Sequence, residues 1–148
     1  MQAAEFVVVG ALAAGKAVFC EKPLGVDLAA SRALVQAVED SNTPNAINFP
    51  FADARAANAI DRALGEGALG EVAGADVRLH FSQWPRDWQE NATWLAERAE
   101  GGFVREVFSH FVYLVQRLFG PASLEHASVL YPAEPRLCET QFLARLDC

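Results

Sequence analysis

The tripeptide Glu21-Lys22-Pro23 follows directly on a short apolar run, and its lysine could serve chemistry. We interpret the apolar run as a buried strand, and the carboxyl ends of parallel strands are where α/β proteins place their ligands. An ammonium group there can hydrogen-bond a substrate oxygen and stabilise the negative charge that develops during hydride transfer at a carbinol. Taken alone, the tripeptide is a weak signal, and a surface Glu-Lys pair before a turn is the better explanation of it.

Four polar residues recur at helical spacing later in the chain: Glu106, His110, Tyr113 and Arg117. At ~100° per residue they fall within about 60° of one another, with apolar residues on the opposite side. Glu106 and His110 are spaced i,i+4, so the carboxylate can orient the imidazole or couple to its charge. A histidine placed that way can take a proton from a substrate hydroxyl as a hydride leaves. The alternative is a solvated polar face, which most amphipathic helices have.

The segment Trp84-Pro85-Arg86-Asp87-Trp88 combines two large aromatic side chains with an arginine. This combination suits stacking on a sugar or binding of a carboxylate. Trp84, Arg86 and Trp88 are therefore candidate substrate contacts, although loop packing is the simpler explanation for either tryptophan taken singly.

A metal site and a disulfide framework are not indicated. The chain has 3 cysteines, an odd number at wide spacing, so the pattern indicates neither a set of disulfides nor a CxxC metal site. Such a pattern is typical of a protein in a reducing cytoplasm. His80, His110 and His126 show no metal-ligand spacing, and a strand-face or loop position is the default interpretation of His80 and His126. We expect no metal.

The overall charge excludes several kinds of partner. Lysine and arginine number 12 against 19 acidic residues, a net charge of −7, and nucleic-acid phosphates need clustered cations. An anionic membrane surface is disfavoured for the same reason, and no apolar run approaches the ~18 residues of a membrane span. The first residues lack a basic segment, so we expect no signal peptide and a cytoplasmic protein.

Residues 10–17 nearly spell a P-loop, but the match fails on chemistry and on order. Ala17 stands where a hydroxyl must hold Mg²⁺. A P-loop also needs a strand before its glycines and a helix after them, so that the helix N-terminus faces the phosphate. Here Pro23 follows a β-branched run and blocks helix propagation. A strand at Phe6–Val9 would weaken this objection.

These residues need elements to position them, and the first half of the chain predicts an alternating α/β order. Asp27 and Asp53 are suited to cap helices, and Gly15 to end one. The predicted elements are a helix over 3–14, a strand over 17–20, a helix over 28–40, a turn over 42–44, a strand over 46–51 and a helix from 53 through 64. This order implies parallel strands with right-handed crossovers.

The second half predicts a different pattern, and we place a domain boundary near residue 52. Alternating residues over 71–82 predict a strand with one covered face. A long aromatic and charged stretch precedes a helix over 104–119, which Gly120-Pro121 closes. Two further strands are predicted over 123–131 and 138–147, so the second half is mixed α+β.

Three segments together resemble one family. Residues 13–24 resemble the "AL-x-AGK-x-V-x-x-EKPL" segment of Gfo/Idh/MocA dehydrogenases, and residues 67–72 are similar to the family's "G-x-LG-x-[VI]" entry into its second domain. Gly101-Gly102 with Glu106 and His110 resembles the family's "GGG…D-x-x-x-H" helix. The three landmarks occur in the family's order and span nearly the whole chain.

The resemblance implies a fold and a division into domains. Residues 1–52 would be the remnant of a dinucleotide-binding domain, the C-terminal part of a Rossmann-type parallel sheet. Residues 53–148 would be an incomplete α+β domain for substrate binding and oligomerisation, with a mostly antiparallel sheet. The parent protein would form homo-oligomers through that sheet.

The resemblance also implies an activity and residue roles. The protein would be an NAD- or NADP-dependent dehydrogenase that transfers a hydride to or from a sugar-, polyol- or related alcohol/carbonyl substrate. Lys22 matches the lysine that contacts substrate and nicotinamide, and Glu21 and Pro23 match positions lining the nicotinamide, where the Lys-Pro bond is often cis. His110 matches the acid/base, and Glu106 matches the family's Asp.

Two departures keep an alternative open. Glu106 replaces Asp, and Tyr113 stands where the family often has a further Asp, so a polyol site built on two carboxylates is in doubt. Tyr113 would be a hydroxyl ligand or only the flank of the helix. A non-catalytic binding or scaffold relative of the same fold is the alternative, against which the joint presence of Lys22 and His110 argues.

The sequence lacks the G-x-G-x-x-G fingerprint, which lies upstream in the family, so we interpret the chain as an internal fragment. We expect the 148 residues alone to be inactive and to bind neither NAD nor NADP usefully, because the fingerprint presents a helix N-terminus to the pyrophosphate. Titration calorimetry with each cofactor measures this. Micromolar binding of either one would contradict the prediction.

Overall fold

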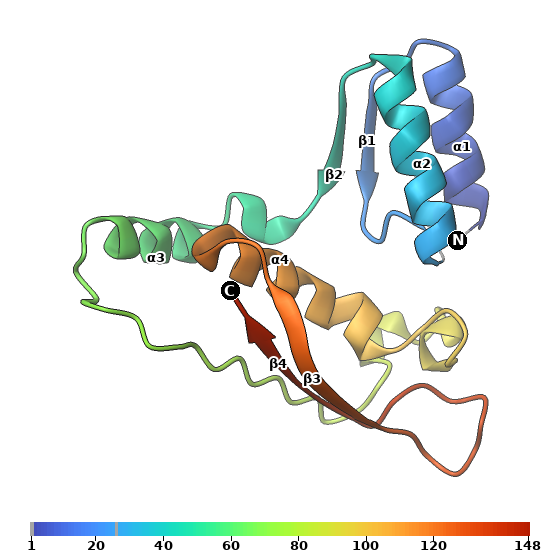
Figure 1. Ribbon diagram of the computed structural model, residues 1–148. Helices are drawn as coiled ribbons and strands as arrows, with labels where there is room; N and C mark the ends of the chain where they lie inside the picture. The colour runs from blue at the N-terminus through green and yellow to red at the C-terminus, as the bar shows by residue number, and fades with distance from the viewer. Residues whose placement is uncertain (1, 26) are drawn as a thin grey trace. The chain divides into compact units, whose positions relative to one another are not determined.

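The computed structural model describes residues 2–25 and 27–148, and the chain forms two compact units, Met1–Phe49 and Pro50–Cys148. The first unit contains α1 (Gln2–Ala13), β1 (Val18–Glu21), α2 (Leu28–Ser41) and β2 (Asn45–Asn48) (Figure 1). Its two strands pair in parallel, in a register that runs from Val18 opposite Asn45 to Glu21 opposite Asn48. The predicted parallel crossover is therefore confirmed.

Local sequence signals set the helices of the first unit. The carboxylate of Asp27 accepts a hydrogen bond from the backbone N–H of Ala30 at 2.8 Å, as predicted for the N-cap of α2. Gly15 follows α1 with a φ of 65°, the left-handed conformation that glycine adopts without steric cost. Val8, Leu12 and Leu34 form the buried core in which α1 and α2 meet.

The second predicted strand and the helix after it differ from expectation. β2 ends at Asn48, and Pro50–Ala52 forms a 3₁₀ turn instead of continuing the strand, because proline has no N–H for the ladder. Asp53 does not cap the next helix: α3 (Arg55–Gly65) has Ala54 at its N-cap. The Asp53 carboxylate instead accepts from the side-chain amide of Asn58 at 3.2 Å.

The second unit consists of helical segments and an antiparallel hairpin. After α3, its helical segments are two short 3₁₀ turns, Asp87–Gln89 and Thr93–Ala96, a π-helical turn at Val104–Phe108, and α4 (Ser109–Phe119). β3 (Ser123–Leu130) pairs with β4 (Gln141–Asp147), with an irregularity between Leu124 and His126. The predicted helix over 104–119 and both later strands are thus confirmed, although the helix begins with a wider turn.

The predicted strand over 71–82 is wrong. These residues have an irregular backbone outside both sheets, and most of them are exposed. Alternating side chains predict one covered face, but a strand also needs a partner for its N–H and C=O groups, and residues 71–82 pair with neither β3 nor β4. The segment 104–119 packs instead against the hairpin: the ring centroids of Phe108 and of Phe142 in β4 are 4.8 Å apart.

The start of the long helix rests on a buried carboxylate. Glu139, only 8% exposed, accepts a hydrogen bond at 2.7 Å from the N–H of Val104, where the helix dipole favours a negative charge. Gly102 has a φ of 95°, and a Cβ there would collide with this carboxylate. A Cβ on Gly101 would collide with the carbonyl oxygens of Trp94 and Leu95. The glycine pair therefore allows the close approach that fixes the helix start.

Replacing the buried carboxylate should destabilise the second unit. We expect Glu139→Ala to lower its free energy of unfolding by about 1–3 kcal/mol, because the helix loses a charge-assisted acceptor for a shielded N–H. All 3 tryptophans lie in this unit, at positions 84, 88 and 94, so their fluorescence during urea unfolding reports on it selectively. Glu71→Ala, at an exposed position, is the matched control. Equal midpoints for the two variants would contradict the proposed anchor.

Candidate functional site

In the first unit, the carboxyl ends of the two parallel strands carry polar groups side by side. Glu21 and Asn48 are register partners, and the Asn48 amide donates a hydrogen bond to a Glu21 carboxylate oxygen at 2.8 Å. Lys22 and Pro23 follow, both half-buried and joined by a cis peptide bond. Sequence reasoning missed Asn48, because only the register of the parallel pair places it beside Glu21.

In the second unit, His110 lies in the first turn of α4 and is half-buried. The ring of Phe51 packs edge-on against its imidazole, with centroids 6.1 Å apart and planes at 73°. Phe51 also packs on Phe111, at 5.1 Å. Sequence reasoning did not single out Phe51, because 59 positions separate it from His110 and nothing local indicates the contact.

Glu106 lies one turn before His110, inside the π-helical turn. An i,i+4 spacing predicts a shared face for a regular helix, whereas a π turn holds an extra residue and shifts that relation. Glu106, His110 and Tyr113 are nevertheless all half-buried, so this face is not the freely solvated one of the alternative interpretation. Turns of this kind are frequent at functional sites.

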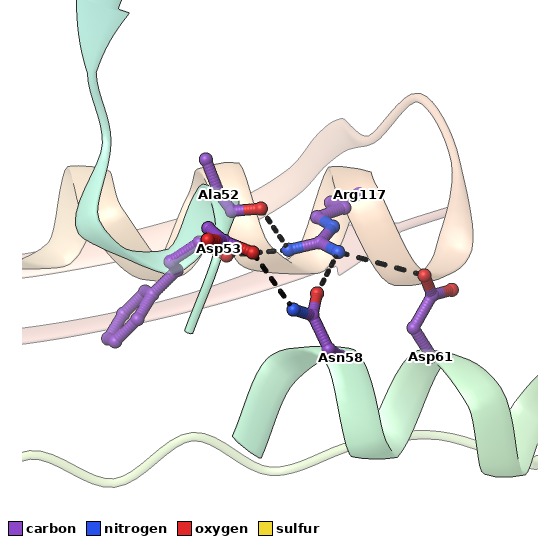
Figure 2. A network of polar contacts seen from close by, with 6 residues as sticks. Ala52, Asp53, Asn58, Asp61 and Arg117 are labelled. Atoms are coloured by element: carbon purple, nitrogen blue, oxygen red, sulfur yellow. Dashed lines mark hydrogen bonds and ion pairs between the residues drawn. The ribbon is translucent and has the colours of Figure 1, made fainter. Parts of the chain in front are cut away.

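Arg117, the fourth member of the predicted polar face, serves a different purpose. Its guanidinium reaches the backbone of Phe51 and Ala52 and the side chains of Asn58 and Asp61 (Figure 2). These contacts join α4 to the 3₁₀ turn and to α3. Arg117 is thus a clamp within the second unit.

The aromatic loop is built around Arg86. The guanidinium carbon lies 5.4 Å from the ring centroid of Trp84 and 4.6 Å from that of Trp88, so the cation stacks on both indoles. The Arg86 Nε donates to the buried side chain of Gln89 at 2.8 Å. Arg86 is therefore held in one orientation by three side chains.

The two tryptophans of this loop differ in role. The indole N–H of Trp84 donates to the carbonyl of Leu95 at 2.9 Å, and its ring packs on Phe81 and Phe103. Trp88 is 72% exposed.

Two pockets lie in the described part of the protein, one in each unit. The pocket in the first unit has a volume of about 450 Å³, and the pocket beside Arg86 in the second unit has a volume of about 350 Å³. The latter is lined by Gln83, Pro85, Arg86, Asp87, Glu90, Thr93 and Ala96.

Burial shifts the titration of two thiols. Desolvation, followed by the charge of Glu21, raises the pKa of Cys20. Desolvation, followed by the charge of Glu139, raises the pKa of Cys138. Both thiols therefore stay protonated near neutral pH, and neither is an activated nucleophile.

Within residues 2–25 and 27–148 no group of His, Cys, Asp and Glu is placed to hold a metal, and no helix is long and apolar enough to cross a bilayer.

Curated relatives resemble most of the chain. No family model matches it. Levoglucosan dehydrogenase of Pseudarthrobacter phenanthrenivorans is 26% identical over 133 residues, which cover 87% of this chain and 34% of the relative. 1,5-Anhydro-D-fructose reductase of Ensifer adhaerens is 33% identical over 102 residues, which cover 68% of this chain and 29% of the relative. Trans-1,2-dihydrobenzene-1,2-diol dehydrogenase of Macaca fascicularis is 32% identical over 125 residues, covering 80% and 34%.

Solved structures share the fold. An oxidoreductase from Agrobacterium radiobacter, in complex with NAD+, L-tartaric acid and magnesium, superposes with a TM-score of 0.76 and 20% identity, covering 99% of this chain and 42% of that one. An inositol dehydrogenase homologue from Azotobacter vinelandii, in complex with NADH and myo-inositol, superposes with a TM-score of 0.68 and 19% identity. The match covers 97% of this chain and 38% of that one. The parallel and antiparallel sheets of this chain confirm the predicted fold class.

The three lines of evidence agree on one family. The sequence carries the three landmark segments in order, the curated relatives are dehydrogenases and reductases, and the structural neighbours have the same fold. The chain spans about a third of the length of the curated relatives it matches. The relatives and neighbours are Gfo/Idh/MocA-type oxidoreductases, and the chain resembles them over this part of their length.

Proposed function

We propose that the protein transfers a hydride between NAD or NADP and a sugar-, polyol- or related alcohol/carbonyl substrate. One observation carries the proposal: Glu21 is the last residue of β1, and Lys22-Pro23 follow at the carboxyl end of this strand of a parallel pair, the position at which α/β proteins bind ligands. The names of the relatives, a levoglucosan dehydrogenase and an anhydrofructose reductase, support the same reaction class.

The polar groups at the carboxyl ends of β1 and β2 are of the kinds that can hydrogen-bond a nicotinamide. Glu21 is held by Asn48, so the edge of the sheet carries a fixed carboxylate, and Lys22 and Pro23 continue from it. We assign these three residues to the cofactor. When bound, the nicotinamide supplies or accepts the hydride; the protein's part is to orient the ring and the reacting oxygen.

The ionisable side chains take separate roles in this proposal. The Lys22 ammonium donates a hydrogen bond to the reacting oxygen and stabilises the negative charge that develops on it. His110 accepts the hydroxyl proton during oxidation and returns it during reduction. Glu106 orients the imidazole, and the Tyr113 hydroxyl binds a substrate hydroxyl.

The aromatic loop contributes substrate contacts. Exposed Trp88 offers an indole face for the apolar face of a sugar ring, and the terminal nitrogens of Arg86 donate to its oxygens. Trp84 supports Arg86 from the side of the core, since its own N–H is already bonded. The pocket beside Arg86 supplies further hydrogen-bonding groups, from Gln83 and Thr93 among others.

We further propose a cytoplasmic homo-oligomer with small-molecule substrates and no nucleic-acid or membrane partner. The hairpin supports oligomerisation, because Leu124 and Leu143 are exposed apolar side chains on β3 and β4. The net charge of −7 disfavours binding to phosphates. A non-catalytic relative of the same fold is the alternative, and Glu106 and Tyr113 in place of two aspartates are its motivation.

The two lysines of the chain give a matched test of the catalytic assignment. In a complete protein carrying this segment, we expect Lys22→Met to lower kcat on the order of a hundredfold or more, because the lost interaction is made with charge in the transition state. The Kd for the cofactor should change far less. Lys16→Met, the same substitution at an exposed position, should leave kcat unchanged. Near-normal turnover of Lys22→Met would refute the catalytic role assigned to Lys22.

Substrate stacking on Trp88 can be measured separately. We expect Trp88→Ala to raise KM roughly three- to tenfold with little change in kcat, from the loss of about 0.5–1.5 kcal/mol of ring contact. Stability should hardly change, since this side chain is 72% exposed. Trp94→Ala, which lies outside the Arg86 stack, serves as the control. An unchanged KM in Trp88→Ala would remove this residue from the substrate site.

A further inference from the structure

Arg117 is bonded at four points, two in the 3₁₀ turn before α3 and two in α3 itself. Its Nη1 donates to the carbonyl oxygens of Phe51 and Ala52 at 2.7 and 2.8 Å. Its Nη2 donates to the Asn58 side-chain oxygen at 2.6 Å and lies 3.7 Å from a carboxylate oxygen of Asp61 (Figure 2). The Arg117 side chain is 23% exposed, so these bonds are partly shielded from water.

The fork of contacts fixes the 3₁₀ turn at Pro50–Ala52. A turn of three residues leaves most of its carbonyls without intrahelical partners, and one guanidinium nitrogen satisfies two of them. Asn58 is held on both sides, since its amide nitrogen also donates to Asp53 at 3.2 Å. A lysine could not reproduce this arrangement, because its single ammonium lacks the planar fork.

Phe51 links this turn to the candidate acid/base. Its carbonyl is bonded to Arg117, whereas its ring packs against His110 with centroids 6.1 Å apart. His110 and Arg117 are seven positions apart on α4, about 10 Å along the helix axis. Phe51 therefore contacts one helix at two separate points, and the carbonyl bond fixes the backbone from which its ring reaches His110.

We propose that Arg117 is a positioning residue for His110 and acts through Phe51. The guanidinium fixes the turn, the turn fixes the Phe51 ring, and the ring limits the rotation of the imidazole against which it packs. Arg117 itself touches neither substrate nor cofactor. The inference rests on the proposed function, in which His110 moves the substrate proton.

Kinetics of variants in a complete protein carrying this segment test the inference. We expect Arg117→Met to lower kcat on the order of tenfold to a hundredfold with less than a twofold change in KM, because misplacement of an acid/base affects the chemical step. Arg117→Lys keeps the charge without the fork, so it should recover only a small part of kcat. Asp61→Asn removes the long ion pair to a carboxylate that is 53% exposed and should resemble the unmodified protein.

A second readout separates positioning from mere stabilisation. Nuclear Overhauser effects between the Phe51 ring and the His110 imidazole should be present in the unmodified protein and in Asp61→Asn, and should weaken or vanish in Arg117→Met. If Arg117→Met only lowers Tm, and keeps both kcat and these effects at temperatures where it is folded, the inference is overturned.

Failure of the inference can be told apart from failure of the proposed function. His110→Asn in the same protein measures the contribution of the imidazole directly. Absence of turnover in the unmodified protein refutes the proposed function, and full turnover in His110→Asn refutes the role of His110 in it, whereas the ring contacts in Arg117→Met still decide whether Arg117 positions His110. Loss of turnover in His110→Asn together with normal kcat in Arg117→Met refutes the positioning role alone.

Discussion

The buried carboxylate of Glu139 is the contact on which the second unit depends. It accepts the N–H of Val104 at 2.7 Å, directly over Gly102, and so sets where the long helix begins. Every residue of that helix takes its position from this start, His110 included. A buried charge is costly unless hydrogen bonds and a favourable dipole offset the loss of water, and the helix N-terminus supplies both. Gly102 is required because a Cβ there would collide with the Glu139 carboxylate, and Gly101 is required because a Cβ there would collide with the carbonyl oxygens of Trp94 and Leu95.

The same carboxylate joins the helix to the hairpin. Glu139 lies two positions before β4 begins at Gln141, and the preceding residues are bonded to the loop around Leu95. The N–H of Cys138 donates to Ala96, and the N–H of Arg98 donates to Arg136, both at 2.8 Å. The helix is thus fixed at its start by residues of the hairpin connection and near its end by Arg117, so its middle, with His110 and Tyr113, lies between two anchors.

Sequence reasoning succeeded where the cause was local. The cap at Asp27 and the end of α1 at Gly15 depend on neighbours within a few positions, so a single sequence contains the necessary signal. The strand over 71–82 failed because alternation says nothing about a partner strand. Glu139 and Phe51 could not be found, since their contacts with Val104 and His110 span 35 and 59 positions. The site roles of Lys22 and His110 came from chemistry and resemblance, and they stay predictions.

Two arginines differ in how many of their N–H donors are hydrogen-bonded within the protein, and this difference separates a structural role from a ligand-binding one. A guanidinium has five N–H donors in a fixed plane. In Arg117 three hydrogen bonds and an ion pair occupy both terminal nitrogens, so little capacity is left for a substrate. In Arg86, across the described part of the chain, only Nε donates a hydrogen bond, to Gln89, and the indoles hold the plane of the group. Arg86 is therefore oriented without its terminal donors being consumed, which is the state that recognition of a sugar hydroxyl requires. A helical wheel alone would have favoured Arg117, whereas the bonding favours Arg86.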